Sequence, residues 1–359
     1  MPPSLTLDVT PDLAEGFATA AWDVAGIVAV LLFLLLVQIL FMRGLIAARR
    51  RREQRFRAAW EPLFAECVDA VPSELPLLER RDAPAFLMIW NHLQESLRDE
   101  VTERLNHLAR RVAADEAALS LLRHGGLRDR LIAITALGHL HDDREWDRLA
   151  ELVGSGDGIV SLSAARALMR IDAERAAGPV IGRLAERTDW PTAVVAAMLA
   201  DAGPDAISKP LAEAAESAAT DRAPRLIRLL EFAHADVAGP VVHRQLEDED
   251  ALEKVIACLR VAADPVVLDR IRELMRDPRW QVRLHAAQAL GRLGTREDED
   301  LLVGALSDPQ WWVRYRAAQS LASLPLVPVS HIEHLSRTVD DPFGRDILCQ
   351  VLAEKELAC

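Results

Sequence analysis

The chain has 359 residues, of which 50% are hydrophobic but only 5% aromatic, and its formal net charge is −13. A core of mainly leucine, alanine and valine favours closely packed helices and disfavours a β-sandwich. The acidic balance disfavours a nucleic-acid-binding protein, because such a protein needs a basic surface to displace the counterions of phosphate groups, although an acidic chain can still hold a local basic stripe.

A transmembrane helix is predicted over residues 24–42, a stretch without any charged residue. At a rise of about 1.5 Å per residue this stretch spans about 28 Å, close to the hydrocarbon thickness of a bilayer, which is about 30 Å. A cleaved signal peptide would need a basic start and a shorter apolar run before a small-residue cleavage site. Residues 1–42 instead hold four acidic residues and no Lys or Arg, so we expect an anchor behind a short extracytoplasmic tail over residues 1–23.

The charge after the apolar stretch predicts the orientation of the anchor. The juxtamembrane segment 43–57 holds seven arginines and one glutamate. By the positive-inside rule, this segment and the rest of the chain lie in the cytoplasm and the N-terminus lies outside. Arginine greatly outnumbers lysine, a usage typical of GC-rich bacterial genomes, so we expect a single-pass protein of the bacterial inner membrane. Four arginines are expected to contact anionic lipid headgroups, each contributing about 1 kcal/mol: Arg49, Arg50, Arg51 and Arg52.

Residues 58–126 are expected to be helical, as either a cap or a set of divergent repeats. Two stretches, 85–97 and 101–112, have the apolar spacing of amphipathic helices. The segment 71–76, VPSELP, is expected to end the helix that leaves the membrane, because proline disfavours helix at its own and the preceding residue.

An internal repeat is the strongest signal in the chain. Residues 277–293 (DPRWQVRLHAAQALGRL) and 308–324 (DPQWWVRYRAAQSLASL) are identical at ten of seventeen positions at an offset of 31. Leucines continue this register at a spacing of 29 or 31: Leu137, Leu168, Leu199, Leu230, Leu259, Leu290, Leu321 and Leu352.

Each repeat has the pattern of two antiparallel helices. The first helix is exemplified by 264–275 and 297–306, and the second is expected to open at Asp277-Pro278 or Asp308-Pro309, with aspartate as the N-cap. A pair of about 31 residues cannot bury its apolar face alone, so neighbouring pairs must stack. The sequence therefore predicts an all-α solenoid of about eight helix pairs over residues 127–359.

The pattern Asp-Pro-x-Trp-x-Val-Arg-x-x-Ala-Ala-x-x-Leu resembles the HEAT repeat. The short period resembles the HEAT-like class first noted in phycobilisome lyases rather than the eukaryotic arrays of roughly 40–47 residues. This resemblance implies a protein-binding scaffold. Single-pass HEAT-like proteins of similar layout are encoded near membrane glycosyltransferases for exopolysaccharide, so the resemblance also implies a membrane-associated protein partner.

Two sets of repeated residues are the candidates for function. The resemblance implies that Asp277, Arg283, Asp308 and Arg314 form a structural ladder, in which the arginine reaches the turn aspartate of its own or the next repeat. The alternative is that these arginines form a basic ridge that binds a ligand. The second set is aromatic and is expected to bind the partner: Trp312, the best candidate, followed by Trp311 and Trp280, which share one register and are also expected to pack between repeats.

We expect neither enzymatic activity nor a cofactor or metal. The four cysteines form no CxxC pair, and the chain has no glycine-rich phosphate loop and no GxSxG motif. Histidines at 139, 141, 331 and 334 lack a third ligand at a recognisable spacing. The His-Glu dipeptides of deoxyhypusine hydroxylase are also absent. An enzyme of the bilin-lyase type remains the alternative function, since such lyases share the repeat.

Overall fold

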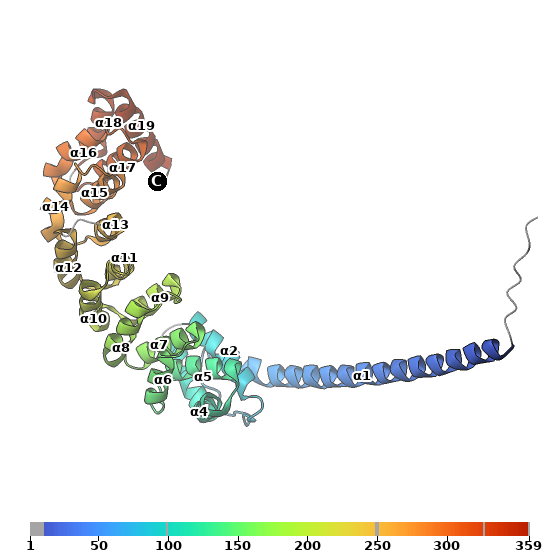
Figure 1. Cartoon of the computed structure of the whole chain (residues 1–359). Coiled ribbons are helices and arrows are strands. Elements are labelled where there is room, and N and C mark those ends of the chain that lie inside the picture. The colour runs from blue at the N-terminus through green and yellow to red at the C-terminus, as the bar shows by residue number, and fades with distance from the viewer. Residues whose placement is uncertain (1–10, 98–99, 248–250, 326, 358–359) are drawn as a thin grey trace, which may run out of the picture. The chain divides into compact units, whose positions relative to one another are not determined.

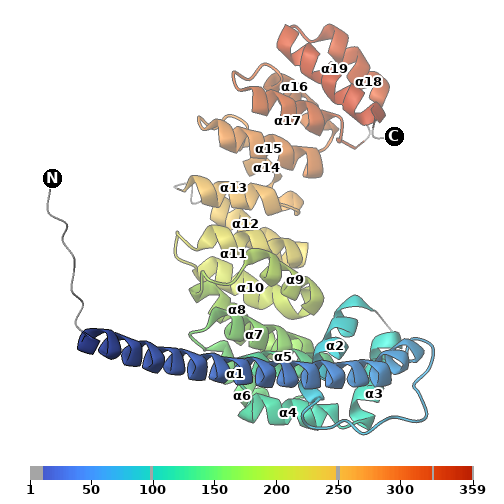
Figure 2. The same ribbon diagram turned by 90° about the vertical axis from the view of Figure 1, so that its right-hand side faces the viewer.

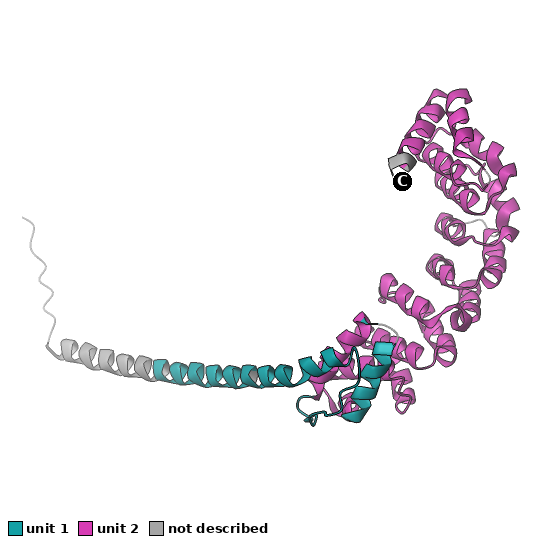
Figure 3. Ribbon diagram, turned by 180° about the vertical axis from the view of Figure 1, so that it is seen from behind, with its two compact units in different colours: residues 1–82, 97–112 teal, residues 83–96, 113–359 magenta. Residues whose placement is uncertain are grey.

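The computed structural model describes residues 11–97, 100–247, 251–325 and 327–357, and within them the side chains of residues 32–354 except that of Arg49. The described residues form helices and turns without any β-strand, so the all-α prediction is confirmed. The first ten residues of the predicted extracytoplasmic tail lie outside the described part. The chain divides into two compact units, residues 1–82 with 97–112 and residues 83–96 with 113–359 (Figure 3).

The first unit contains the long helix α1 (Pro11–Glu66) and the short helix α3 (Glu100–Arg111). Phe56, Trp60 and Phe64 lie one turn apart at the end of α1, and all three are buried. Neighbouring ring centroids in this series are 6.2 Å apart. Arg111 of α3 donates hydrogen bonds to main-chain carbonyls of the segment that follows α1. This end of α1 is therefore anchored by aromatic packing.

In the part of α1 nearer the N-terminus, between Leu32 and Ile46, most side chains are apolar and exposed. The helix is long and apolar enough to cross a membrane. Its large exposed hydrophobic residues run from Leu32 to Ile46. Burial of such side chains stabilises a protein by about 1.5–3 kcal/mol each, so this surface is unfavourable in water.

The second unit contains α2 (Ala83–Ser96) and sixteen further helices, which we group in chain order into eight pairs (Figures 1 and 2). We call the first helices of the pairs row A and the second helices row B. The pairs are α4 (Ala114–His124) with α5 (Leu127–Leu140), α6 (Trp146–Val153) with α7 (Gly158–Ile171), α8 (Ala173–Glu186) with α9 (Thr192–Ala202), α10 (Pro204–Ser217) with α11 (Ala223–Leu229), α12 (Ala235–Glu247) with α13 (Leu252–Val261), α14 (Leu268–Leu274) with α15 (Trp280–Leu293), α16 (Glu299–Ala305) with α17 (Trp311–Leu321), and α18 (Val329–Thr338) with α19 (Pro342–Leu357).

The leucines of the predicted register lie in the core of this solenoid. Those from Leu137 to Leu321 are all buried, whereas Leu352 in the last pair is half-buried. Three short 3-10 turns lie between helices: η1 (Leu230–Phe232), η2 (Pro265–Val267) and η3 (Arg296–Asp298). The first pair begins in α4, upstream of residue 127, and the predicted domain boundaries stay predictions.

Row-B helices approach each other most closely where one of them carries a glycine directly after its register leucine. A Cβ atom added to Gly138 of α5 would lie 2.9 Å from the Cα of Ala167 in α7. A Cβ atom added to Gly291 of α15 would lie 2.8 Å from the Cα of Ser320 in α17. Real Cβ atoms do not make such contacts, so these two crossings require glycine.

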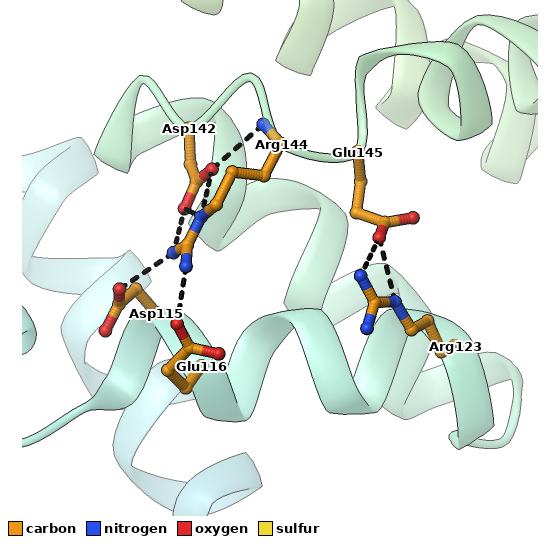
Figure 4. A network of polar contacts seen from close by, with 6 residues as sticks. All are labelled: Asp115, Glu116, Arg123, Asp142, Arg144 and Glu145. Atoms are coloured by element: carbon orange, nitrogen blue, oxygen red, sulfur yellow. Dashed lines mark hydrogen bonds and ion pairs between the residues drawn. The ribbon is translucent and has the colours of Figure 1, made fainter.

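The first pair is joined to the following turn by an arginine with three carboxylate partners (Figure 4). Arg144 pairs with Asp115 at 2.8 Å and with Glu116 and Asp142 at 2.5 Å. The hydrogen bonds that Arg144 donates to Asp142, together with those to Glu116 and Asp115, outweigh burial and raise the pKa of Arg144. The acidic residues of this region are therefore engaged within the fold.

The predicted starts of two row-B helices are wrong by about one turn. We expected α15 and α17 to open at Asp277-Pro278 and Asp308-Pro309, but they begin at Trp280 and Trp311. The aspartate is not the N-cap, because its carboxylate accepts the main-chain N–H two residues on and closes a turn before the helix.

Candidate functional site

An aromatic patch lies at the start of α17, made of the exposed Trp311 and Trp312 and the half-buried Tyr315. Trp311 and Trp312 are 40% and 56% exposed. Their rings meet edge to face with centroids 4.6 Å apart. Trp311 also stacks on Tyr315 with centroids 5.1 Å apart. The rings hold one another in place, so the patch presents a preorganised apolar surface.

Trp280 lies at the position of the preceding repeat that is equivalent to Trp311. Its side chain is half-buried, whereas that of Trp311 is exposed. The shared register of Trp280 and Trp311 therefore does not give them the same exposure. Phe343, the α19 residue equivalent to Trp312, is 63% exposed, and the guanidinium of Arg314 lies 5.5 Å from its ring centre. The aromatic surface thus continues from α17 to α19.

Of the predicted structural ladder, Arg283 and Asp308 come together across two repeats. Arg283 Nε and Nη2 donate to the two carboxylate oxygens of Asp308 at 2.7 and 3.0 Å. Only 14% of the Arg283 side chain and 8% of the Asp308 side chain is exposed. Arg283 Nη1 also donates to the main-chain carbonyls of Asp277 and Pro278. The Asp277 carboxylate pairs instead with Arg279, whose hydrogen bond lowers the pKa of Asp277.

Arg314 makes the same main-chain contacts as Arg283 but has no carboxylate partner among the described residues. Its Nη1 donates to the carbonyls of Asp308 and Pro309 at 2.8 and 3.3 Å. Val339 stands where the next aspartate would be, 31 residues after Asp308. Arg345 repeats the pattern by donating to the Val339 carbonyl. Arg314 therefore reaches the turn aspartate of its own repeat through the main-chain carbonyl of Asp308 and not through a carboxylate.

The sequence did not single out a polar cavity of about 350 Å³ on α15, α17 and α19. Its wall includes Gln288, Arg292, Arg316, Gln319 and Glu354. A signal was available, because Gln288 and Gln319 belong to the identical AAQ segment of the repeat. Polar residues that recur at one position of an otherwise apolar helix pattern are expected to lie side by side on a common surface of the stacked helices.

The arginines expected to contact lipid differ in their surroundings. Arg50 and Arg51 are exposed. Arg52 Nε donates to Asp82 at 2.8 Å, so a carboxylate already neutralises part of its charge. The side chain of Arg49 lies outside the described residues.

Two of the four histidines contact other protein groups. His139 is half-buried beside Arg170, and desolvation together with the charge of Arg170 lowers its pKa to about 3. His331 Nε2 lies 2.5 Å from a carboxylate oxygen of Glu299. Within the described residues, no three His, Cys, Asp or Glu side chains are grouped so as to hold a metal ion.

The comparisons with known proteins concern the C-terminal repeats. The family model of HEAT repeats matches residues 240–322 and 268–353. No curated protein matches the chain. Among solved structures, an engineered protein covers 77% of this chain and 85% of its own, at 17% sequence identity and a TM-score of 0.34. HEAT repeats in general suggest a protein-interaction scaffold. The stacked helices of the second unit form an α-solenoid, and its residues 240–353 are similar to HEAT repeats.

Proposed function

We propose that the chain is a membrane-tethered, non-enzymatic scaffold that docks a membrane-associated protein on its cytoplasmic solenoid. The aromatic patch of Trp311, Trp312 and Tyr315 carries this proposal. Two adjoining exposed tryptophans are unfavourable in water, and tryptophan is enriched among the residues that dominate binding energy at protein interfaces. The patch is preorganised by its ring contacts, so little side-chain entropy is lost when a partner covers it.

The exposed apolar stretch of α1 supports tethering. A bilayer removes apolar side chains from water along the whole circumference of a helix, which no contact within the described chain does for Leu32 to Ile46. Tethering confines the solenoid to the membrane surface and raises its effective concentration toward partners in the same membrane. A membrane glycosyltransferase for exopolysaccharide is one partner of this kind.

Topology gives the first test. A reporter fused after Cys359 should be active only if it is of the kind that works in the cytoplasm. We expect this location because the arginines follow the apolar stretch and none precedes it. Neutral replacements of Arg49 to Arg52 should produce a measurable fraction of inverted chains. Paired cytoplasmic and periplasmic reporters in intact cells measure both fractions. Periplasmic activity of the unaltered fusion would contradict the orientation.

The aromatic patch gives the second test, with Trp280 as the matched control. Trp312→Ala should weaken capture of membrane proteins at least tenfold and leave the melting temperature unchanged, because the exposed ring contributes little packing. Trp280→Ala removes a half-buried ring and should cost about 2 kcal/mol of stability while capture persists. Circular-dichroism melts and quantitative capture from membranes decide between them. Equal loss of stability in both variants would remove Trp312 from the docking surface.

A further inference from the structure

The cavity on α15, α17 and α19 has the size and polarity of a ligand site. Its volume is about 350 Å³, and sites for small ligands range over roughly 300–1,000 Å³. Gln288 and Arg292 lie in its wall on α15, Arg316 and Gln319 on α17, and Glu354 on α19. Four of these five side chains carry N–H donors, so the cavity is rich in hydrogen-bond donors.

The two cavity arginines lack carboxylate partners within the described residues. Arg292 donates to the main-chain carbonyls of Leu259 and Arg260 at 2.8 and 3.0 Å. Arg316 donates to the side-chain oxygen of Gln319 at 2.9 Å. The Nε of Arg316 is buried and has no hydrogen-bond partner. A buried donor without a partner is unfavourable, and a ligand oxygen that reached it would supply the missing hydrogen bond.

Positive charge accumulates around the cavity. Burial and the charges of Arg260 and Arg316 lower the pKa of Arg292. Burial is the largest cause that lowers the pKa of His285. A hydrogen bond to Gln288 opposes it, and the charges of Arg260, Arg316 and Arg292 lower this pKa further. This part of row B is therefore a local basic surface on an acidic chain.

Arg314 also lacks a carboxylate partner among the described residues, but several arginines elsewhere in the solenoid have such partners. Arg144 has three of them. A second cavity, of about 250 Å³ on α7 and α9, contains Arg170 together with Asp201, and their charged groups are 3.8 Å apart. The only carboxylate in the wall of the α15–α19 cavity among the described residues is Glu354. Its two oxygens accept hydrogen bonds from Tyr315 and Gln350, and no ion pair with an arginine forms there.

We propose that this cavity is an oxyanion-binding site that takes a carboxylate or phosphate group of a ligand between Arg292 and Arg316. The guanidinium groups supply charge-assisted hydrogen bonds to paired oxygens, and the amides of Gln288 and Gln319 supply neutral donors. Glu354 sits in the wall as a fixed negative charge and sets the affinity by repulsion. The site is distinct from the aromatic patch but adjoins it, because Tyr315 of the patch donates a hydrogen bond to Glu354 in the cavity wall.

The first experiment uses the full-length chain in neutral detergent, with inorganic phosphate and citrate as separate probes against chloride at constant ionic strength. A saturable rise in melting temperature is expected with at least one probe, because a ligand that binds only the folded state stabilises it. Phosphate alone, or citrate alone, would identify the oxyanion class. Arg316→Gln should weaken the apparent affinity at least tenfold. Arg296→Gln, an exposed arginine of η3 outside the cavity, should respond as the unaltered chain does.

Two further variants give effects of opposite sign. Glu354→Gln removes the repelling charge and should tighten binding several-fold. Gln288→Glu places a carboxylate beside the arginines, so the unliganded protein should melt higher and the response to either probe should disappear. The proposal is overturned if neither probe gives a saturable response in the unaltered chain. It is also overturned if Arg316→Gln and Arg296→Gln respond alike.

Discussion

Replacing Arg283 with alanine is expected to lower the free energy of unfolding by about 3 kcal/mol, because it leaves the buried Asp308 carboxylate without its charged partner. The variant also loses two bonds to main-chain carbonyls. Thermal and chemical unfolding followed by circular dichroism measures the change. Hydrogen exchange should place the loss in α15 and α17.

Arg314→Ala is the matched control for that variant. Arg314 occupies the same position in the next repeat and makes the same two main-chain bonds, but it has no carboxylate partner among the described residues. Its loss should cost about 1.5 kcal/mol, the scale of hydrogen bonds from a charged group. The difference between the two variants reports the ion pair, measured against the contact of Arg314 with the Phe343 ring. Equal costs would mean that the carbonyl bonds alone carry the stabilisation.

Gly291→Val is expected to destabilise the solenoid by about 3 kcal/mol, because the added side chain meets the backbone of Ser320. A main-chain atom cannot rotate away, so α15 and α17 must separate and lose their packing. The equivalent change at Gly138 should behave likewise, since its Cβ would meet the backbone of Ala167.

Gly304→Val is the control for the glycine crossing. Gly304 lies inside α16, and a Cβ there would meet no atom within 4 Å. Glycine and valine both have poor helix propensity, so the stability should change by less than about 0.5 kcal/mol. Melting temperatures of the three variants give the comparison. A similar loss for Gly304→Val would mean that helix propensity, and not the crossing, determines the effect.

The fold could be predicted because apolar residues recur in the sequence at the period of the repeat. One buried leucine per repeat places each row-B helix, and the buried series from Leu137 to Leu321 follows that register. Leu352 departs from it as a half-buried residue of the last pair. The helix starts were harder to predict, since Asp277 and Asp308 can either cap a helix or close a turn, and the sequence pattern is the same for both.

The cavity was missed for a different reason. Its donors come from helices about 31 residues apart, so their proximity depends on how α15 and α17 cross rather than on local pattern. The net charge of −13 also pointed away from a basic surface. The net charge of a chain does not report how charge is distributed over the fold. The carboxylates around Arg144 are paired with an arginine, whereas Arg292 and Arg316 have no carboxylate partner among the described residues.

Val339 stands where the repeat pattern places an aspartate, and this difference affects how the array responds to mechanical load. The joint between α14–α15 and α16–α17 contains the Arg283–Asp308 ion pair, whereas Arg314 has only its main-chain bonds and Phe343 at the next joint. A solenoid in which each repeat contacts only its neighbours yields at its weakest joint. When a chain held at α1 is pulled from the C-terminus, the α18–α19 pair should detach first, as a separate step at low force. The remaining repeats should stay stacked through that step.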